Sequence, residues 1–354
     1  MKNKLISGPH VTTVRSVDQI MRQVIIALAP ALGFGVLLFG WPTFYLIVVT
    51  VLSAILFEVF CLKLRGANAT THIKDCSAIL TGILIAMTLP PWAPWWIGVT
   101  GSGIAIILGK HVYGGLGQNL FNPAMLARVA LLISFPIEMT TWVNVTPLFT
   151  GPGLIESFSI FISGMPANDG ITGATTLGLV KTGFTQNQTL PGILGDYSGI
   201  LAFIGWERGS LGETSSILLL IGGIGLIRKG VIKWYLPGSV LITIFILSSI
   251  FYMLDSSHYL SPWEHLNSGG LILLAFFIAT DYVTSPNTPL GQIIFGAGCG
   301  LLIFVIRSWG GYPEGSGFAI LLMNSVTPLI DHYIKPRIYG RYRDGRPLDI
   351  SSSN

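Results

Sequence analysis

A short hydroxyl-bearing turn is the segment of this sequence whose residues best suit chemistry. From Asp169 to Thr176 it reads Asp-Gly-Ile-Thr-Gly-Ala-Thr-Thr and lies in a long polar stretch between apolar runs. Gly173 and Ala174 place no bulk beside the Thr175 hydroxyl, and glycine adopts backbone conformations that other residues avoid. With an acid shortly before it, this hydroxyl suits covalent modification. For the tetrapeptide around Thr175 taken by itself, a surface turn is the alternative interpretation.

Two of the acids that lie in or beside apolar runs, where an ionised group is costly, are candidates for chemistry. Glu58 could bind Na+ or take a proton, or it could pair with Lys63 and Arg65 near the end of its run. Asp281 ends a short apolar run beside a polar break. We therefore treat Glu58 and Asp281 as candidates for an ion pathway.

The composition is that of a polytopic membrane protein. Of the 354 residues, 51% are hydrophobic and 10% charged, whereas soluble domains carry roughly a quarter charged residues. The net charge of +4 is small, so we expect no nucleic-acid partner. Cys61, Cys76 and Cys299 form no Cys-x-x-Cys pair, which argues against an iron–sulfur or zinc site on this chain.

Apolar runs long enough to approach a membrane span recur along the chain. We expect about ten transmembrane helices, at approximately 21–40, 42–62, 76–91, 94–110, 122–137, 213–228, 234–254, 267–281, 289–306 and 317–333. The chain is thereby divided into a cytoplasmic N-terminal segment 1–20, a first membrane half 21–137, an external loop 138–212, a second membrane half 213–333 and a cytoplasmic tail 334–354.

The distribution of basic residues orients these spans. Sixteen of the 20 Lys and Arg residues fall on one side, the exceptions being Arg128, Lys181, Arg208 and Arg307. Because positive residues concentrate in the cytoplasm, both termini are expected there and the loop carrying Thr175 on the outside.

The region from His72 to about Leu132 weakly resembles the region from His265 to about Val326. In both, an apolar run meets a proline-containing break, and a further run leads to a glycine pair. Five spans separate the two starts, so the second copy would be inverted. Inverted repeats with broken helices indicate a ligand or ion site near the midplane.

Several segments in order resemble one family. They are Ser7-Gly8-Pro9-His10, the stretch from Gly114 to Met125, the stretch from Ala279 to Gly291, the stretch from Gly310 to Gly315, and the turn that ends at Thr175. Together they cover most of the chain, which resembles the D subunits of Rnf complexes. These complexes are ferredoxin:NAD+ oxidoreductases, related through this component to the B subunit of the Na+-translocating NADH:quinone reductase.

The resemblance implies a membrane flavoprotein that belongs to an electron-transfer complex and helps to drive Na+ or H+ across the cytoplasmic membrane. FMN would be attached to Thr175 through a phosphoester by a flavin transferase, with Asp169, Gly170, Thr172, Gly173 and Ala174 as its attachment motif. Partners would be the other Rnf subunits, A, B, C, E and G, with ferredoxin and NAD reached through them, and membrane lipid.

The resemblance also implies a noncovalent flavin, riboflavin, among the spans. From local chemistry we expect it near the helix breaks, with Asn119, Asn122, Thr284 and Thr288 as contacts. Arg128, about 9 Å beyond Asn122 along a helix, could hold a flavin ring oxygen, a partner's carboxylate or a lipid phosphate, or extend to the headgroups.

A secondary transporter or solute channel is the alternative function, because inverted repeats and broken helices are equally typical of transporters. The discriminating feature is the stretch from Asp169 to Thr175, since a permease has no use for a flavin-attachment sequence.

Overall fold

The computed structural model describes residues 15–67, 72–164, 172–186, 188–193, 199–336 and 346 of the 354-residue chain. Within these ranges the protein is mainly helical, and the two strands are two residues long each. Strand β1 (Trp142–Val143) pairs antiparallel with β2 (Thr172–Gly173), with Trp142 opposite Gly173. The prediction of an all-α polytopic membrane protein is confirmed.

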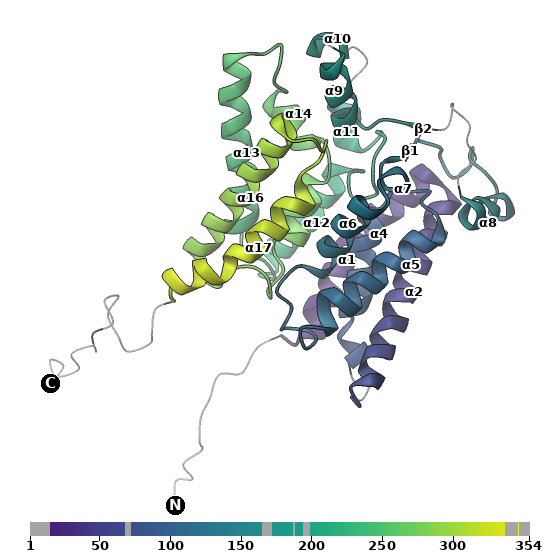
Figure 1. The fold of residues 1–354 in the computed structure, drawn as a ribbon, viewed down its shortest axis with the longest axis vertical. Helices are drawn as coiled ribbons and strands as arrows, with labels where there is room; N and C mark the ends of the chain where they lie inside the picture. The colour runs from purple at the N-terminus through teal and green to yellow at the C-terminus, as the bar shows by residue number, and fades with distance from the viewer. Residues whose placement is uncertain are drawn as a thin grey trace, which may run out of the picture.

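Helical segments occupy each of the ten predicted runs (Figure 1). They are α1 (Val17–Phe39), α2 (Trp41–Leu64), α4 (Ser77–Thr88), α5 (Trp95–Gly103) continued by the π-helix η2 (Ile104–His111), α6 (Pro123–Ser134), α12 (Ser216–Arg228), α13 (Tyr235–Leu254), α15 (Leu271–Leu273) continued by the π-helix η3 (Leu274–Ile278), α16 (Pro289–Trp309) and α17 (Ser316–Tyr333). Of these, α1, α2, α13 and α16 are long and apolar enough to cross a membrane by themselves. The other segments are shorter, interrupted or less apolar, so the number of crossings stays a prediction.

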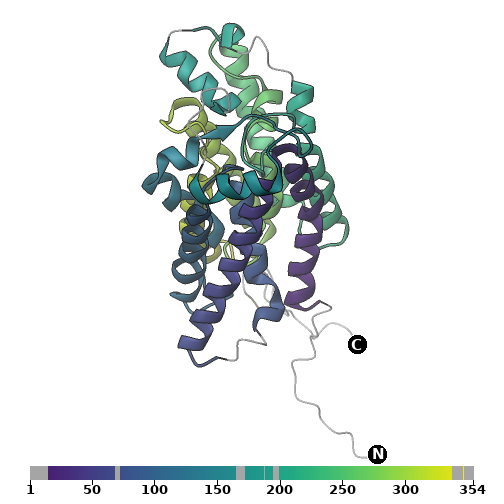
Figure 2. The same ribbon diagram turned by 90° about the vertical axis from the view of Figure 1, so that its right-hand side faces the viewer.

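Shorter elements connect the spans. They are the 3-10 helix η1 (Ile73–Asp75), α7 (Pro136–Thr140), α8 (Leu154–Ser163), α9 (Thr176–Thr185), α10 (Leu190–Ile193), α11 (Gly199–Ile204) and α14 (Pro262–Asn267). Elements α7 to α11, β1 and β2 gather at one end of the molecule, opposite the end where α1 begins and α17 ends (Figures 1 and 2). We call these the loop end and the termini end.

Local sequence explains the main helix boundaries. A capping box of Ser16 and Gln19 begins α1, and Gly40, at φ +77°, ends it and leads directly into α2. Helix α6 begins at Pro123, directly after Asn122, whose side chain accepts hydrogen bonds from the next two free amides. Thr288 caps α16 in the same way, directly before Pro289, so both breaks end in strongly specified helix N-termini.

The short helices of the two halves run in opposite directions. The Gly212 amide donates to the Met87 carbonyl at the end of α4, at 2.6 Å, and a Cβ on Gly212 would overlap Leu273 near the start of the α15–η3 segment. At the other end, Ser77 at the start of α4 and Asp281 just after η3 line one cavity. This antiparallel arrangement is the one that an inverted repeat requires.

Candidate functional site

Thr175 lies where β2 gives way to α9. It is the N-cap of α9, and its Oγ1 accepts the Gly178 amide at 3.2 Å. The residue is buried, at 8% exposure. Amides at the start of a helix lack intrahelical partners and favour negative charge nearby. The Thr175 hydroxyl therefore lies where an attached anion would be stabilised.

Thr175 forms part of the wall of a cavity of about 940 Å³ at the loop end. The lining comes from α6, the α7–β1 segment, the start of α9, the loop before α12 and the segment that leads into α17. It includes Arg128, Met139, Trp142, Ala174, Thr175, Glu213, Tyr312, Glu314 and Phe318. Thr175 also borders a smaller hollow of about 290 Å³ with Glu207 and Arg208.

Gly173 is required by a close approach of Arg208. A Cβ at position 173 would overlap the Arg208 guanidinium. Gly173 is paired with Trp142 in the β-ladder and lies two residues before Thr175. The Arg208 guanidinium therefore packs against the backbone that leads to Thr175. Arg208 thus brings a permanent positive charge close to the Thr175 hydroxyl.

The Thr175 cavity has a cation with no carboxylate at ion-pair distance among the described residues. Arg128 contacts the Met139 sulfur at 3.9 Å, and its guanidinium lies over the Trp142 ring, 6.0 Å from the centroid. Glu213 lies in the loop before α12, where burial, reinforced by Glu314, raises its pKa to about 8, so this carboxyl is largely protonated at neutral pH. The cavity wall therefore favours an anionic or electron-rich ligand.

Part of the predicted attachment motif lies outside the described residues. Asp169 and Gly170 lie outside the described residues, as does the side chain of Thr172, whose backbone belongs to β2. Ala174 lines the cavity next to Thr175.

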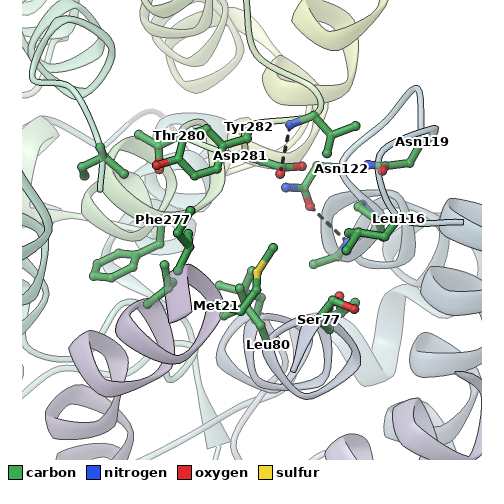
Figure 3. Close-up of a pocket in the computed structure, with 18 of the residues that line it drawn as sticks. Met21, Ser77, Leu80, Leu116, Asn119, Asn122, Phe277, Thr280, Asp281 and Tyr282 are labelled. Atoms are coloured by element: carbon green, nitrogen blue, oxygen red, sulfur yellow. Dashed lines mark hydrogen bonds between the residues drawn. The ribbon is translucent and has the colours of Figure 1, made fainter. Parts of the chain in front are cut away.

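A second cavity, of about 800 Å³, lies between the two halves nearer the termini end. Figure 3 shows Asn122 and Asp281 reaching toward one another from opposite halves, with Asn119 and Ser77 beside them. Further lining residues are Met21, Leu80, Lys110, Leu116, Ala124, Phe276, Phe277, Thr280 and Tyr282. The lining is mainly apolar with a few convergent polar groups, as in many cofactor sites.

Asn122 joins the helix breaks of the two halves. Its backbone amide donates to Asn324 Oδ1 at 3.0 Å, and its Nδ2 donates to the Ile278 carbonyl at 3.4 Å. Asn324 in turn donates from Nδ2 to the Thr284 carbonyl at 3.2 Å. Side chains therefore satisfy backbone groups released by the breaks, across the two halves for the Asn122 amide and the Ile278 carbonyl and within the second half for the Thr284 carbonyl.

The structure brings together some of the residues expected around the second flavin and separates others. Asn119 and Asn122 line the 800 Å³ cavity, and so does Asp281, which was expected in an ion pathway. Arg128, Thr284 and Thr288 do not belong to its described lining. Arg128 lies about two turns along α6 from Asn122 and lines the Thr175 cavity instead.

The two threonines have local structural roles at the break. The Thr284 hydroxyl donates to Asp281 Oδ2 at 3.1 Å, while Thr288 caps α16 by accepting the Gly291 amide. Their hydroxyls are therefore used within the break itself.

Glu58 has partners that the sequence did not indicate. Its Oε1 accepts a hydrogen bond from Lys110 Nζ at 2.7 Å, and its Oε2 lies 3.1 Å from His111 Nε2. Lys110 Nζ also donates to Ser77 Oγ at 2.8 Å. Lys63 and Arg65, the partners considered from sequence, form no ion pair with Glu58 in the described structure. The signal missed was the pair of consecutive basic residues that ends η2.

Comparison with known proteins assigns this chain to a family. A model of the NQR2, RnfD, RnfE family matches residues 4–340. The chain belongs to this family. Relatives named as the D subunit of an ion-translocating oxidoreductase complex include one from Halorhodospira halophila, 48% identical over 98% of both chains. Another, from Stutzerimonas stutzeri, is 50% identical over 94% of this chain and 95% of its own. One from Salmonella paratyphi A is 40% identical over 95% of this chain and 98% of its own. Both cavities lie within the part of the chain that the family model matches.

Proposed function

We propose that this protein is the D subunit of an ion-translocating oxidoreductase complex and carries FMN covalently on Thr175. Relatives with that name align with at least 94% of the chain. The observation that carries the flavin assignment is the buried Thr175 hydroxyl at a helix N-terminus, in the wall of a 940 Å³ cavity. FMN would supply redox chemistry that side chains lack.

The residues around Thr175 would orient and stabilise such a group. Free amides at the start of α9, together with the Arg208 guanidinium, would stabilise a phosphodiester on Thr175 Oγ1. Arg128 would hold an electron-rich edge of the ring system, and a protonated Glu213 adds no opposing negative charge. Trp142 and Tyr312 supply aromatic walls.

For the 800 Å³ cavity we propose riboflavin as the noncovalent occupant. Asn119, Asn122 and Lys110 offer hydrogen-bond donors, Asp281 offers an acceptor, and Phe276 belongs to the apolar wall. This donor and acceptor set suits a planar heterocycle with carbonyl and imino groups.

The complex would comprise the other Rnf subunits, A, B, C, E and G, with ferredoxin and NAD bound by partners. It would move Na+ or H+ across the cytoplasmic membrane. In the described structure α2 ends beside Lys63 and Arg65 at the termini end, opposite the Thr175 cavity, which supports cytoplasmic termini and an external flavin loop.

Secondary transport is the second candidate function. The observation that favours it is the position of the 800 Å³ cavity between two oppositely directed halves. A covalent flavin on Thr175 would decide against it, because a solute carrier has no need of a redox group.

The attachment is tested by expressing the chain in a host with its flavin transferase and examining it on a denaturing gel and by intact mass. The wild type is expected to fluoresce and to carry one FMN, whereas Thr175→Ala should carry none. Thr176→Ala is the matched control, because Thr176 is equally buried at 8% exposure and should leave attachment intact. Wild-type protein without covalent flavin, despite an active transferase, would favour the transporter.

A further inference from the structure

One buried cluster, the Glu58 cluster, consists of Glu58, Lys110 and His111. Exposure is 3% for Glu58, 2% for Lys110 and 9% for His111. The carboxylate lies between the two basic groups and contacts one with each oxygen, at 2.7 and 3.1 Å. Lys110 and His111 are consecutive residues that end the π-helix η2, and π-helical turns are frequent at functional sites.

One side of the cluster faces the 800 Å³ cavity. Lys110 and Ser77 both line that cavity, and their side chains are hydrogen bonded to each other. Lys110 is the one Lys or Arg among the described lining residues, and the cavity's carboxylate is Asp281 of the opposite half. The Glu58 cluster therefore presents an exchangeable ammonium proton to whatever occupies the cavity.

The other side of the cluster leads toward the termini end. His111 ends η2, and Val112 and Tyr113 directly after it are 67% and 42% exposed. His111 Nδ1 has no hydrogen-bond partner among the described residues. The contact of Nε2 with Glu58 has the distance of an ion pair but not the alignment of a hydrogen bond. Both ring nitrogens are also shielded from solvent, so His111 takes up a proton only when water reaches the ring.

Other charged groups surround the cluster without occupying it. Asp75 Oδ1 accepts the Ser77 hydroxyl at 2.7 Å, and Arg65 lies close to Gly115. Cys61 is one helical turn from Glu58 on α2. Among these groups, only Ser77 is hydrogen bonded to a member of the cluster in the described structure, so Lys110, Glu58 and His111 form one continuous series.

We propose that the Glu58 cluster exchanges protons between the termini end and the redox group in the 800 Å³ cavity. This inference rests on the proposed occupation of that cavity by a noncovalent flavin. Electrons from a one-electron carrier in a neighbouring protein of the complex would reduce the group bound in the cavity, and Lys110 Nζ would donate the accompanying proton. A proton that His111 takes up from water at the termini end passes to the Glu58 carboxylate and from there to the neutral Lys110 amine, which restores the original charges of all three groups. Reoxidation reverses each transfer, so charge in the cavity stays balanced.

The test is a spectroelectrochemical titration of the purified complex between about pH 6 and about pH 9, which follows the noncovalent flavin. The wild-type midpoint potential should fall as the pH rises, because reduction takes up a proton. Glu58→Gln and Lys110→Met should each lose most of this pH dependence. The double variant Glu58→Gln/Lys110→Met leaves no unpaired buried charge and serves if a single variant fails to fold.

Two controls separate this role from a structural one. Lys181→Met removes a cation outside the cavity, whose Nζ donates to the Gly310 carbonyl, and should leave the titration unchanged. The covalent flavin of the same molecule should keep its pH dependence in every variant. An unchanged pH dependence of the noncovalent flavin in Glu58→Gln and in Lys110→Met would overturn the proton role alone. Wild-type complex that lacks a noncovalent flavin would overturn the proposed occupant and the proton role with it.

Discussion

At the scale of single residues, environment decides what the ionisable groups near Thr175 can do. Glu207 and Glu213 both border the 290 Å³ hollow beside Thr175. Burial raises the pKa of Glu207 to about 7, and its Oε1 has no hydrogen-bond partner among the described residues. A proton on these carboxyls keeps negative charge away from a phosphodiester.

The raised pKa of Glu207 predicts a pH-dependent stability. A carboxyl whose folded-state pKa exceeds its unfolded value stabilises the fold fully below the unfolded pKa and loses this contribution as the pH rises through about 7. Glu207→Gln, which imitates the protonated acid, should therefore raise the thermal midpoint in detergent at pH 8, by the equivalent of at most about 3 kcal/mol. The gain should shrink toward zero near pH 4.5.

Glu156→Gln is the matched control, because Glu156 is exposed on α8. A Glu207→Gln variant whose thermal midpoint differs from wild type by the same amount at about pH 5 and about pH 8 would show that the carboxyl is not protonated in the folded protein.

At the scale of elements, small residues set how closely the spans approach. Helices α1 and α12, the first spans of the two halves, pack against each other. A Cβ on Gly222 of α12 would overlap the backbone carbonyl of Ala27 on α1. Gly225, one turn further along α12, has nothing within 4 Å of such a Cβ. Substitutions at Gly222 and Gly225 therefore separate the effect of the α1–α12 contact from the effect of a residue's intrinsic helix propensity.

Gly222→Val should destabilise the protein, because the backbone of α1 must move away. Overpacking of this kind costs typically about 1–3 kcal/mol. Gly225→Val changes the same helix to the same residue and should have little effect. Thermal unfolding in detergent, followed by circular dichroism, measures both. Equal stability losses in the two variants would show that the α1–α12 contact does not limit packing there.

At the scale of the whole molecule, the two cavities lie toward opposite ends and have no lining residue in common within the described ranges. The two flavin assignments are therefore separable.

Leu80 lines the 800 Å³ cavity from α4, so Leu80→Trp should fill part of it and reduce the noncovalent flavin of the purified complex several-fold. Covalent FMN on Thr175 should be retained in full.

Leu52→Trp makes the same change on α2 at a side chain that is 54% exposed, and both flavins should remain. Flavin released by acid precipitation reports the noncovalent pool, and gel fluorescence reports the covalent one. A Leu80→Trp complex with a full complement of noncovalent flavin would place that flavin elsewhere.

Asn122→Leu examines the same cavity from its polar side. The change removes the α6 cap together with the bond from Nδ2 to Ile278. It should therefore lose noncovalent flavin and also lower stability, which makes Leu80→Trp the cleaner of the two variants.

Local properties of the chain were enough to predict the class of fold, the positions of the helical runs and the turn that contains Thr175. These properties are apolar length, glycine and proline at breaks, and a hydroxyl beside small residues. Asn119, Asn122, Thr284 and Thr288 were named from the breaks, because a break within a span must satisfy its own backbone groups. Asp281 was named as an ion-pathway candidate beside one of them.

The packing of the helices, in contrast, settles which of these residues share a cavity. Arg128 lies with Thr175, because two turns of α6 separate it from Asn122. Glu58 pairs with Lys110 and His111, which lie far along the chain, because α2 packs against η2. Such pairings depend on how helices from distant parts of the chain pack and on the π-helical turn of η2. Apolar periodicity along the sequence carries neither kind of information.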